Sequence, residues 1–396
     1  VVQRGSKIVA NGTRSNPIRF TAASAIDGSL TNPDSASGLW GGIVILGKAP
    51  INRCSNDVRG TAACERVVEG STTAIMGGAT PDDNSGVLNF VRVEYAGYEI
   101  FPGNELNGIT FGGVGYGTEV DYVQVHNNQD DCVEFFGGTV NVKHLVCTGA
   151  GDDNLDIDWG YQGKMQFVVV KQANGVGDHI VESDNVNSDA AVGYLTTPRS
   201  SPKIANFTFI SNGQDDAIKL KEGVSGVYMN GIVSVPSSSS KAAFEHTFLE
   251  TTQDAPGFDK VATHSVFVST PNKYNAGDDS ATDAELGASI EARSTKLTYG
   301  DQTLVGSYFL GTNESAVISA HNNEAAVCAT GSGTAQTNPL CPNGTQIDSF
   351  FSATNYVGAF APGSDEDNNW AAGWTTGLFT PPECPSGTVE TGSNTT

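Results

Sequence analysis

The chain has few basic residues. Its 396 residues include 21 Lys and Arg against 44 Asp and Glu, which gives a formal net charge of -23 at pH 7. Nucleic acids and anionic membrane surfaces are bound through basic patches, so this balance argues against both as partners. An acidic excess fits an extracellular protein that holds divalent cations, and it equally fits a surface that is merely well solvated.

Long apolar runs and common catalytic motifs are also missing. No stretch approaches the ~18–20 apolar residues of a membrane-spanning helix, and no signal peptide is visible. The chain opens with VVQRGSKIVANGTRSNPIRFTA, already strand, turn and strand, so we expect a processed or trimmed N-terminus. The sequence contains no HExxH, GxSxG or GxxxxGKS motif, which argues against zinc peptidases, nucleophile-elbow hydrolases and P-loop enzymes.

What the chain does contain is a repeat of about 22 residues. Three consecutive stretches follow one pattern: TEVDYVQVHNNQDDCVEFFGG from Thr118, TVNVKHLVCTGAGDDNLDIDWG from Thr139, and QGKMQFVVVKQANGVGDHIVE from Gln162. Each has a strand-like apolar segment, a polar acidic turn and a second short apolar segment. Strand-like alternation at this period predicts a solenoid whose turns stack strand on strand. The fold class that we predict is therefore all-β, a right-handed parallel β-helix.

The repeat sets the expected domain organisation. We predict a parallel β-helix over residues 1–240, interrupted by a long polar loop insertion at 49–86. After residue 240 the period weakens, so residues 241–396 are expected to form irregular final rungs and a C-terminal capping region. A terminal solenoid repeat needs a covered or polar end because an open sheet edge invites aggregation.

The seven cysteines predict an oxidising compartment. Cys54 with Cys64, and Cys328 with Cys341, each bracket a polar loop and are expected to form local disulfides. A further pair, at positions 132 and 147, lies inside the repeats and on different sides of the coil. Buried thiols and a disulfide are both open for that pair.

Acidic turns recur from one repeat to the next and predict a metal site. Stacking the repeats places Asp131 over Asn107 and under Asp153, with Glu134 and Asp156 in a second column. Neighbouring rungs lie about 4.8 Å apart, and carboxylates at that spacing repel one another unless a cation, a proton or a donor lies between them. Ca²⁺ prefers such oxygen ligands. The expected calcium ligands are Asp130, Asp131, Asp152, Asp153, Asp156 and Asp178.

Two other interpretations of the same residues stay open. Asp residues at turns often accept backbone N–H bonds without any metal. Alternatively, the carboxylates Asp152, Asp153, Asp178 and Asp216 could serve an enzyme, with Arg199, Lys219 or Lys221 as the base. A lyase would use Ca²⁺ to hold a uronate and a base to take its proton, whereas a hydrolase would use paired carboxylates. Because the Asp-Asp turn recurs on several rungs, it suits an architectural corner better than one unique catalytic site.

Several segments resemble a known group of proteins. WGGIVILGKAPIN (40–52), DDNSGVLNFVRVEYAGYE (82–99), NELNGITFGGVG (104–115) and the run 122–172 are similar to bacterial secreted and outer-surface β-helix proteins, many of them described only as hypothetical proteins or lipoproteins. The likeness covers roughly residues 1–235 and implies a β-helix exported to the bacterial cell surface. It implies no catalytic residue. The acidic composition resembles that of bacterial surface-layer proteins in general character only.

Together these observations predict a non-enzymatic extracellular surface protein, of surface-layer or adhesin-like structural type, stabilised by Ca²⁺. Its expected partners are further copies of itself, surface glycans or both, without nucleic acid and without a transmembrane segment. The alternative is a calcium-dependent polysaccharide lyase or glycoside hydrolase that acts on acidic glycans. A passive glycan-binding module is a third option.

Overall fold

A computed structural model describes most of the chain. The described residues are 1–54, 58–59, 61–100, 106–186, 193–247, 261–270, 272–277, 282–292, 294–300, 348–354, 356–361 and 363–379.

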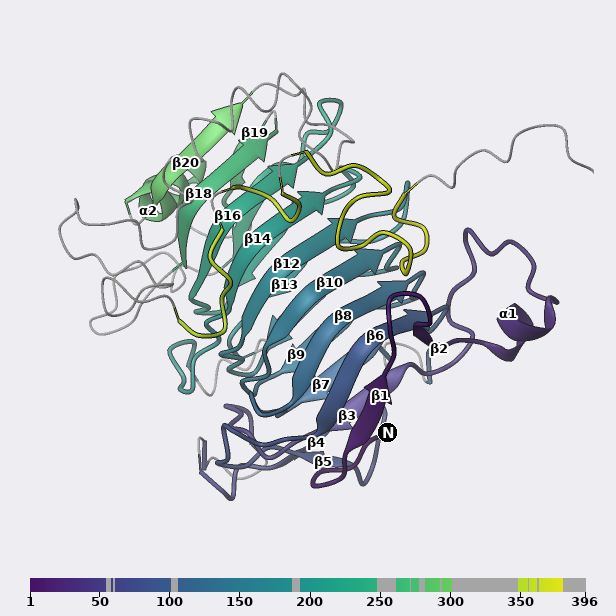
Figure 1. Ribbon diagram of the computed structural model, residues 1–396. Helices are drawn as coiled ribbons and strands as arrows, with labels where there is room; N and C mark the ends of the chain where they lie inside the picture. The colour runs from purple at the N-terminus through teal and green to yellow at the C-terminus, as the bar shows by residue number, and fades with distance from the viewer. Residues whose placement is uncertain are drawn as a thin grey trace, which may run out of the picture.

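The predicted fold is confirmed: the chain forms a right-handed parallel β-helix, drawn as a stack of roughly parallel arrows in Figure 1. Each complete turn of the solenoid gives one strand to a ten-stranded sheet and one to an eight-stranded sheet. The ten-stranded sheet has the order β1-β6-β8-β10-β12-β14-β16-β18-β20, with β2 also paired to β6, and the eight-stranded sheet has the order β19-β17-β15-β13-β11-β9-β7-β3.

The elements have the following bounds. The ten-stranded sheet contains β1 (Ile8–Asn11), β2 (Ile18–Phe20), β6 (Gly86–Glu94), β8 (Glu119–His126), β10 (Val142–Thr148), β12 (Lys164–Lys171), β14 (Lys203–Ile210), β16 (Gly226–Ser234), β18 (Val261–Ser269) and β20 (Thr295–Gly300). The eight-stranded sheet contains β3 (Ile43–Leu46), β7 (Ile109–Gly112), β9 (Val133–Phe136), β11 (Leu155–Asp158), β13 (Val181–Ser183), β15 (Ile218–Lys221), β17 (Ala242–Thr247) and β19 (Asn272–Asn275). A hairpin of β4 (Arg66–Val67) and β5 (Ile75–Met76) and two short helices, α1 (Ala23–Asp27) and α2 (Asp283–Glu291), complete the list.

The register of the strands agrees with the alignment of the repeats. Val142 pairs with Met165, and Cys147 lies between Val125 and Val170. Side chains alternate between the two faces of a strand, so a slip of one residue would reverse every side chain. In β9 this alternation points Val133 and Phe135 into the interior, whereas Glu134 and Phe136 lie outside. The repeat therefore fixes which carboxylates reach the outer face.

A sharp bend runs along the ten-stranded sheet. Six successive strands each carry one non-glycine residue with a left-handed backbone, and the side chains of the first four stack outside the sheet at centroid separations of 4.1–4.8 Å. These residues are Phe90, Tyr122, His144, Phe167, Asn206 and Asn230. Left-handed backbone costs a non-glycine residue about 1 kcal/mol or more, and ring stacking of about 0.5–1.5 kcal/mol offsets part of that cost. Gly and Asn adopt the left-handed region more readily than other residues do, so Asn206 and Asn230 suit these positions and the aromatic residues do not.

Segments outside the repeats cover both sheets. The insertion at 49–86 packs Ile51, Cys64 and Met76 against the outer side of the eight-stranded sheet at its N-terminal end. Residues 348–379 lie across the outer side of the ten-stranded sheet, where Phe360 and Trp374 pack in one apolar cluster with Val146 and Val169. Beyond residue 240, strands β17 to β20 continue both sheets, and the domain boundary that we placed there stays a prediction.

Two disulfides are present among the described residues. Cys54–Cys64 closes the start of the insertion, as predicted, with a Cα–Cα distance of 5.0 Å. Cys132–Cys147 joins the turn before β9 to β10 with a Cα–Cα distance of 6.0 Å. The sequence left thiols and a disulfide open for this second pair, and the narrow interior settles the question because it brings opposite sides of the coil within bonding distance. Positions 328 and 341 lie outside the described residues, so that disulfide stays a prediction.

Removing the interior disulfide is expected to destabilise the solenoid by about 3 kcal/mol, because it closes a loop of 15 residues in the unfolded chain. Denaturant unfolding of the double variant Cys132→Ala/Cys147→Ala measures this loss. The matching variant Cys54→Ala/Cys64→Ala reports on the insertion instead of the interior. A loss below about 1 kcal/mol would contradict the assignment. So would labelling of Cys132 and Cys147 by a thiol reagent in the unfolded, non-reduced wild-type protein.

Candidate functional site

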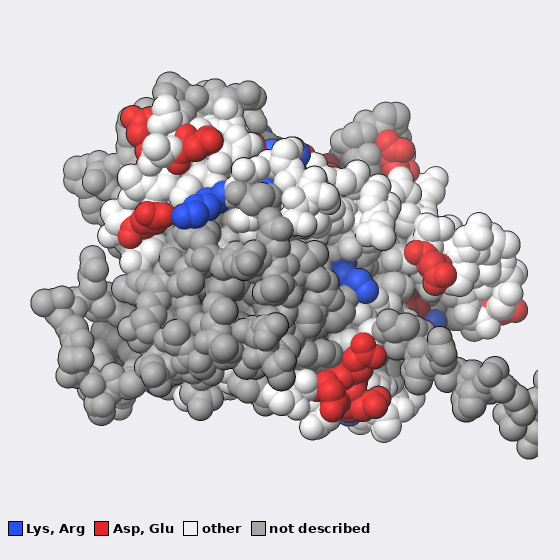
Figure 2. Space-filling model, turned by 90° about the horizontal axis from the view of Figure 1, so that it is seen from above, with Lys and Arg blue, Asp and Glu red and all other residues white. Residues whose placement is uncertain are grey.

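The outer face of the eight-stranded sheet carries a row of charged side chains. Register places one outward residue per rung in a single column, running through Thr110, Glu134, Asp156, Glu182, Lys219 and Glu245. On β3 the column begins with apolar Val44 under the insertion; it becomes acidic at β9 and alternates in charge from β13 onward. More Asp and Glu than Lys and Arg are also visible on the molecular surface in the view of Figure 2.

A second column lies in the turns that precede these strands. The backbone N–H of Asp153 donates to Oδ1 of Asp131 at 3.0 Å, and the N–H of His179 donates to Oδ1 of Asp153 at 2.6 Å. One residue earlier, the N–H of Asp178 donates to the carbonyl of Asp152 at 3.0 Å. Each carboxylate in this column thus accepts from the next rung, which is the turn-capping role that sequence reasoning kept as an alternative.

The predicted ligands fall into three groups of mutually close ligand atoms, each within 4.8 Å. One group contains Asp130, Asp131 and Asp152, and another contains Asp131, Glu134 and Asp156. The third joins Asp153 and Asp178 to His179. The structure therefore brings all six predicted ligands to one edge of the sheet without placing them in a single site, and calcium binding by them stays a prediction.

The second of these groups, Asp131, Glu134 and Asp156, is called the acidic cluster below. Glu134 is 6% exposed and Asp131 is 7% exposed. Burial, reinforced by the charge of Asp156, raises the pKa of both carboxyl groups well above their usual range. Burial and the charge of Glu182 raise the pKa of Asp156 in the same way. Without a cation, these groups are costly to ionise.

Oxygen atoms at the acidic cluster lack hydrogen-bond partners. Asn107 is 3% exposed, and its Nδ2 donates to Glu134 and Thr110 while its Oδ1 has no partner among the described residues. Oδ1 of Asp156 is likewise buried without a partner there. An unpartnered buried oxygen costs about 1–3 kcal/mol, and a hard cation such as Ca²⁺ would use these oxygens as ligands. The donor set of Asn107 with the acidic cluster therefore fits calcium.

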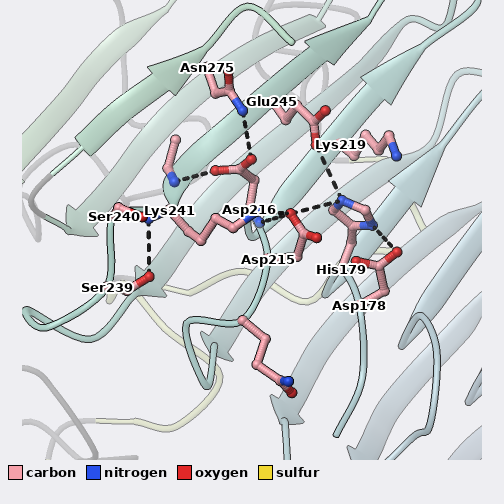
Figure 3. A network of polar contacts seen from close by, with 12 residues as sticks. Asp178, His179, Asp215, Asp216, Lys219, Ser239, Ser240, Lys241, Glu245 and Asn275 are labelled. Carbon is pink, nitrogen blue, oxygen red and sulfur yellow. Dashed lines mark hydrogen bonds and ion pairs between the residues drawn. The ribbon is translucent and has the colours of Figure 1, made fainter. Parts of the chain in front are cut away.

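Further along the sheet, one histidine stands among four carboxylates, and Figure 3 labels three of them, Asp178, Asp215 and Glu245. His179 is 1% exposed, and its Nδ1 lies 3.2 Å from Asp153 and 3.5 Å from Asp178. Its Nε2 lies 3.2 Å from Glu245 and 3.8 Å from Asp215. These five residues are called the His179 network.

The His179 network supplies its own positive charge. Burial opposes the charged imidazole, but hydrogen bonds to Asp153 and Glu245 raise the pKa of His179 to about 10. The ring is therefore an imidazolium at neutral pH, with a donor on each nitrogen. Lys241 donates to Asp215 at 2.7 Å, and despite burial this contact helps lower the pKa of Asp215 to about 2. The His179 network thus contains a cation that offsets part of its negative charge, whereas the acidic cluster contains none.

The bases proposed from sequence do not fit that role at neutral pH. Burial would lower the pKa of Lys221, but the charge of Glu182, 2.6 Å away, raises it above the usual value. Lys219 lies 3.2 Å from the same carboxylate, and its pKa is raised for the same reason. Arg199 is buried and donates to the carbonyls of Gly223 and Val224. All three side chains are therefore held as protonated cations.

The carboxylates proposed for hydrolysis are also poorly placed for that chemistry. Burial raises the pKa of Asp178 to about 7, and a hydrogen bond with Asp215 contributes. Glycosidases hold their two carboxyl groups about 5–9.5 Å apart so that the sugar and a water molecule fit between them. The carboxyl groups of Asp178 and Asp215 share a hydrogen bond, so they lie closer together than this range. Asp216 accepts from Ala242 and Asn275, which is the role of a structural corner.

Sequence reasoning missed part of the site. Glu182 and Glu245 were not predicted, although the two-residue alternation of VES and FEHT would have placed both on the outer face. The described residues also line an open pocket of about 660 Å³ between the insertion and residues 193–197, and Arg59 is its one charged lining residue. No residue of the acidic cluster lines that pocket.

The two parallel sheets and the charged outer face show that the protein is a parallel β-helix with one acidic side. A family model of the pectate-lyase-like β-helix domain matches residues 1–375, and the chain belongs to that family. Searches of the curated proteins and of the solved structures found no match. The β-helix part of the resemblance is thereby confirmed, and its bacterial, lipoprotein and surface-layer parts stay predictions. Among the described residues, no helix has the length and apolar character that crossing a membrane requires.

Proposed function

We propose that the protein is a non-enzymatic extracellular structural protein of the cell surface, stabilised by one or more calcium ions on its acidic face, that assembles with its own copies or with surface glycans. The acidic cluster carries this proposal. Three carboxyl groups converge there, and no ion pair among the described residues involves any of them. Asn107 and Asp156 add the unpartnered oxygens that a cation would take.

Two further observations support an extracellular protein. The disulfides Cys54–Cys64 and Cys132–Cys147 form and persist in oxidising compartments. The net charge of -23 keeps the chain away from anionic surfaces unless divalent cations bridge the two. Cation bridging of this kind would join copies of the protein to one another or to acidic glycans.

A calcium-dependent lyase or hydrolase of acidic polysaccharides is the second candidate, and the family match over residues 1–375 favours it. Against it stand the cations of the outer face. A lyase needs a base that is deprotonated when the substrate binds, and Lys219 and Lys221 are tied to Glu182 as protonated groups. The structural function is therefore preferred.

The experiment that tests the proposal combines calorimetric titration of the metal-free protein with an activity assay on polygalacturonate. We expect saturable binding of Ca²⁺ but not of Mg²⁺ at equal concentration, and a melting temperature that rises by several degrees with Ca²⁺. We expect no new ultraviolet absorbance from a C=C bond and no new reducing ends. Unsaturated product would establish a lyase, reducing ends alone would establish a hydrolase, and absence of calcium binding would refute both.

A further inference from the structure

The two ends of the described solenoid are closed differently. The first rung, with β1 and β3, and the last strands, β19 and β20, lie at opposite ends of the two sheets (Figure 1). At the far end α2 lies against β18 and β19, and its Leu286 and Ile290 are 1% and 2% exposed as part of the interior cluster. At the near end the interior finishes in side chains that are only half-buried: Val2, Ile8, Ile18, Phe20 and Trp40.

The first rung is basic in a chain that is acidic overall. Residues 1–48 contain five Lys and Arg but only two Asp and Glu. Lys7, just before β1, and Lys48, just after β3, are exposed, and neither forms an ion pair with another described residue. A Cβ atom added to Gly5 would lie 3.5 Å from Nζ of Lys48, so this ammonium group reaches the segment that leads to Lys7. The two lysines and the first rung are called the basic end.

The last rungs have the opposite charge. Residues 241–300 contain nine Asp and Glu against five Lys and Arg. α2 turns Leu286 and Ile290 inward and leaves a face of small and acidic side chains exposed. Ala284, Ala288 and Glu291 share this face, because they are spaced by four and three residues. The exposed face of α2, which also includes Asp283 and Glu285, is called the acidic end.

Glu291 is poorly placed for the stability of its own helix. It is the last residue of α2, and the last turn contains no basic residue. The C-terminus of a helix carries partial negative charge, so it favours a cation and disfavours a carboxylate. Among the described residues, its side chain accepts one hydrogen bond, from the exposed hydroxyl of Tyr274 at 3.1 Å. A carboxylate that its own helix disfavours suits a contact outside the monomer.

We propose that copies of the protein stack head to tail, with the basic end of one copy against the acidic end of the next. The small side chains of Ala284 and Ala288 let α2 approach the half-buried first rung, and Lys7 and Lys48 meet the carboxylates around them. Head-to-head contact would bring lysines together, and tail-to-tail contact would bring carboxylates together. Head-to-tail contact alone pairs opposite charges. Because the two surfaces lie at opposite ends, the contact repeats along the axis and builds a filament.

The charge of -23 opposes association, and end-to-end contact is the arrangement that it opposes least. Exposed charges are screened beyond about 8 Å at physiological salt. Glu134 on β9 is two rungs from β3, or about 10 Å, so the acidic cluster stays beyond that range, whereas side-by-side packing would bring acidic faces together. This inference rests on the assembly of copies in the proposed function. It names the surfaces that meet and requires no calcium.

The test is sedimentation velocity in EDTA on the wild type, Glu291→Lys, Lys7→Glu/Lys48→Glu and, as a control, Glu119→Lys. Glu119 is exposed on β8, two strands in from β1, and its substitution changes the net charge as Glu291→Lys does. The wild type and Glu119→Lys should form species that grow with protein concentration, whereas both end variants should associate at least about tenfold more weakly. The wild type should dissociate in about 1 M salt, where the screening length falls to about 3 Å.

Mixing the two end variants separates this arrangement from a symmetric dimer. The mixture retains one intact contact, the basic end of Glu291→Lys against the unchanged α2 of the other variant. It should therefore form pairs but no longer species. Because Glu291→Lys lowers the net negative charge, general repulsion alone predicts stronger association for that variant, which is the opposite of our expectation.

The inference is overturned if the wild type stays monomeric, or if Glu291→Lys keeps its cooperative melting and associates as the wild type does. A mixture that stays monomeric overturns it too, as do electron micrographs of the wild type in which particles widen instead of lengthening. Every measurement is made in EDTA. Failure here therefore leaves calcium binding untouched, and failure of calcium binding leaves the filament untouched.

Discussion

In calcium-free buffer at pH 8, the Asp156→Asn variant should be more stable than the wild-type protein and should lose most of its response to calcium. Asn keeps the shape of the side chain but removes one of three converging negative charges. We expect a gain of about 1–3 kcal/mol without calcium, the usual cost of a buried polar group that has no partner. With calcium the order should reverse, because a ligand at a thousandfold excess over Kd stabilises the wild type by about 4.1 kcal/mol.

The pH dependence follows from the direction of the pKa shifts. Burial raises the folded-state pKa of Asp131, Glu134 and Asp156 above the unfolded values. Stability from these groups is fully present below the unfolded pKa, near 4, and is lost as pH rises through the folded pKa. Metal-free wild-type protein should therefore melt at a lower temperature at pH 8 than at pH 5, and calcium should flatten that slope.

Calorimetric melting at both pH values, with EDTA or with Ca²⁺, measures all these effects. Asp82→Asn is the matched control because Asp82 is exposed and outside every candidate metal group, so it should follow the wild type under each condition. If Asp156→Asn is less stable than the wild type in EDTA at pH 8, the carboxylate has a favourable partner without metal. The calcium site would then be wrong.

Phe135→Ala should cost about 3–5 kcal/mol of unfolding free energy, the range found for a buried aromatic side chain cut back to its Cβ. Phe135 is fully buried in β9, with ring centroids 5.4 Å from Phe111 on one neighbouring rung and 4.5 Å from Tyr161. Removing its ring breaks the aromatic stack at its centre. Neighbouring strands cannot close the gap, because every rung is fixed by the rungs on both sides.

Denaturant unfolding followed by circular dichroism measures the loss. Tyr116→Ala, at a side chain that is 55% exposed, should change the free energy by less than about 0.5 kcal/mol. Solenoid stability is a sum of local and nearest-neighbour contributions, so the Phe135 variant could also unfold in two steps instead of one. A single transition with a loss below about 1 kcal/mol would mean that the interior relaxes far more than the packing around Phe135 indicates.

Much of the fold could be predicted from the sequence because the signal is periodic. Stacking the repeats on one another predicted the register, in which Val142 pairs with Met165, and the register placed Asp131 next to Asp153. The stacked aromatic side chains at left-handed positions could not be predicted, because nothing local in Phe90 or Tyr122 favours that backbone. The position of residues 348–379 over the ten-stranded sheet could not be predicted either, since contacts such as Gln124 with Thr376 join residues 252 positions apart.

The site was predictable to the same extent as the register. Stacking was enough to gather the carboxylates on one edge, but not to show which of them already have a cation. His179 is held as a cation partly because Glu245 reaches it from a rung two turns later, and the sequence spacing gives no sign of that contact. The disulfide at Cys132 depended in the same way on the width of the interior.

The alternation of charge along the eight-stranded sheet has a consequence for how the coil finds its correct stacking. The interior columns are built from Val, Ile, Leu and Phe, so a winding displaced by one full turn would meet almost the same apolar surface. On the outside the neighbours differ: Lys219 lies between Glu182 and Glu245, and a displaced winding would bring like charges together. The outer face thus distinguishes one winding from the next where the interior does not, and misfolded forms with a skipped turn are penalised by electrostatic repulsion.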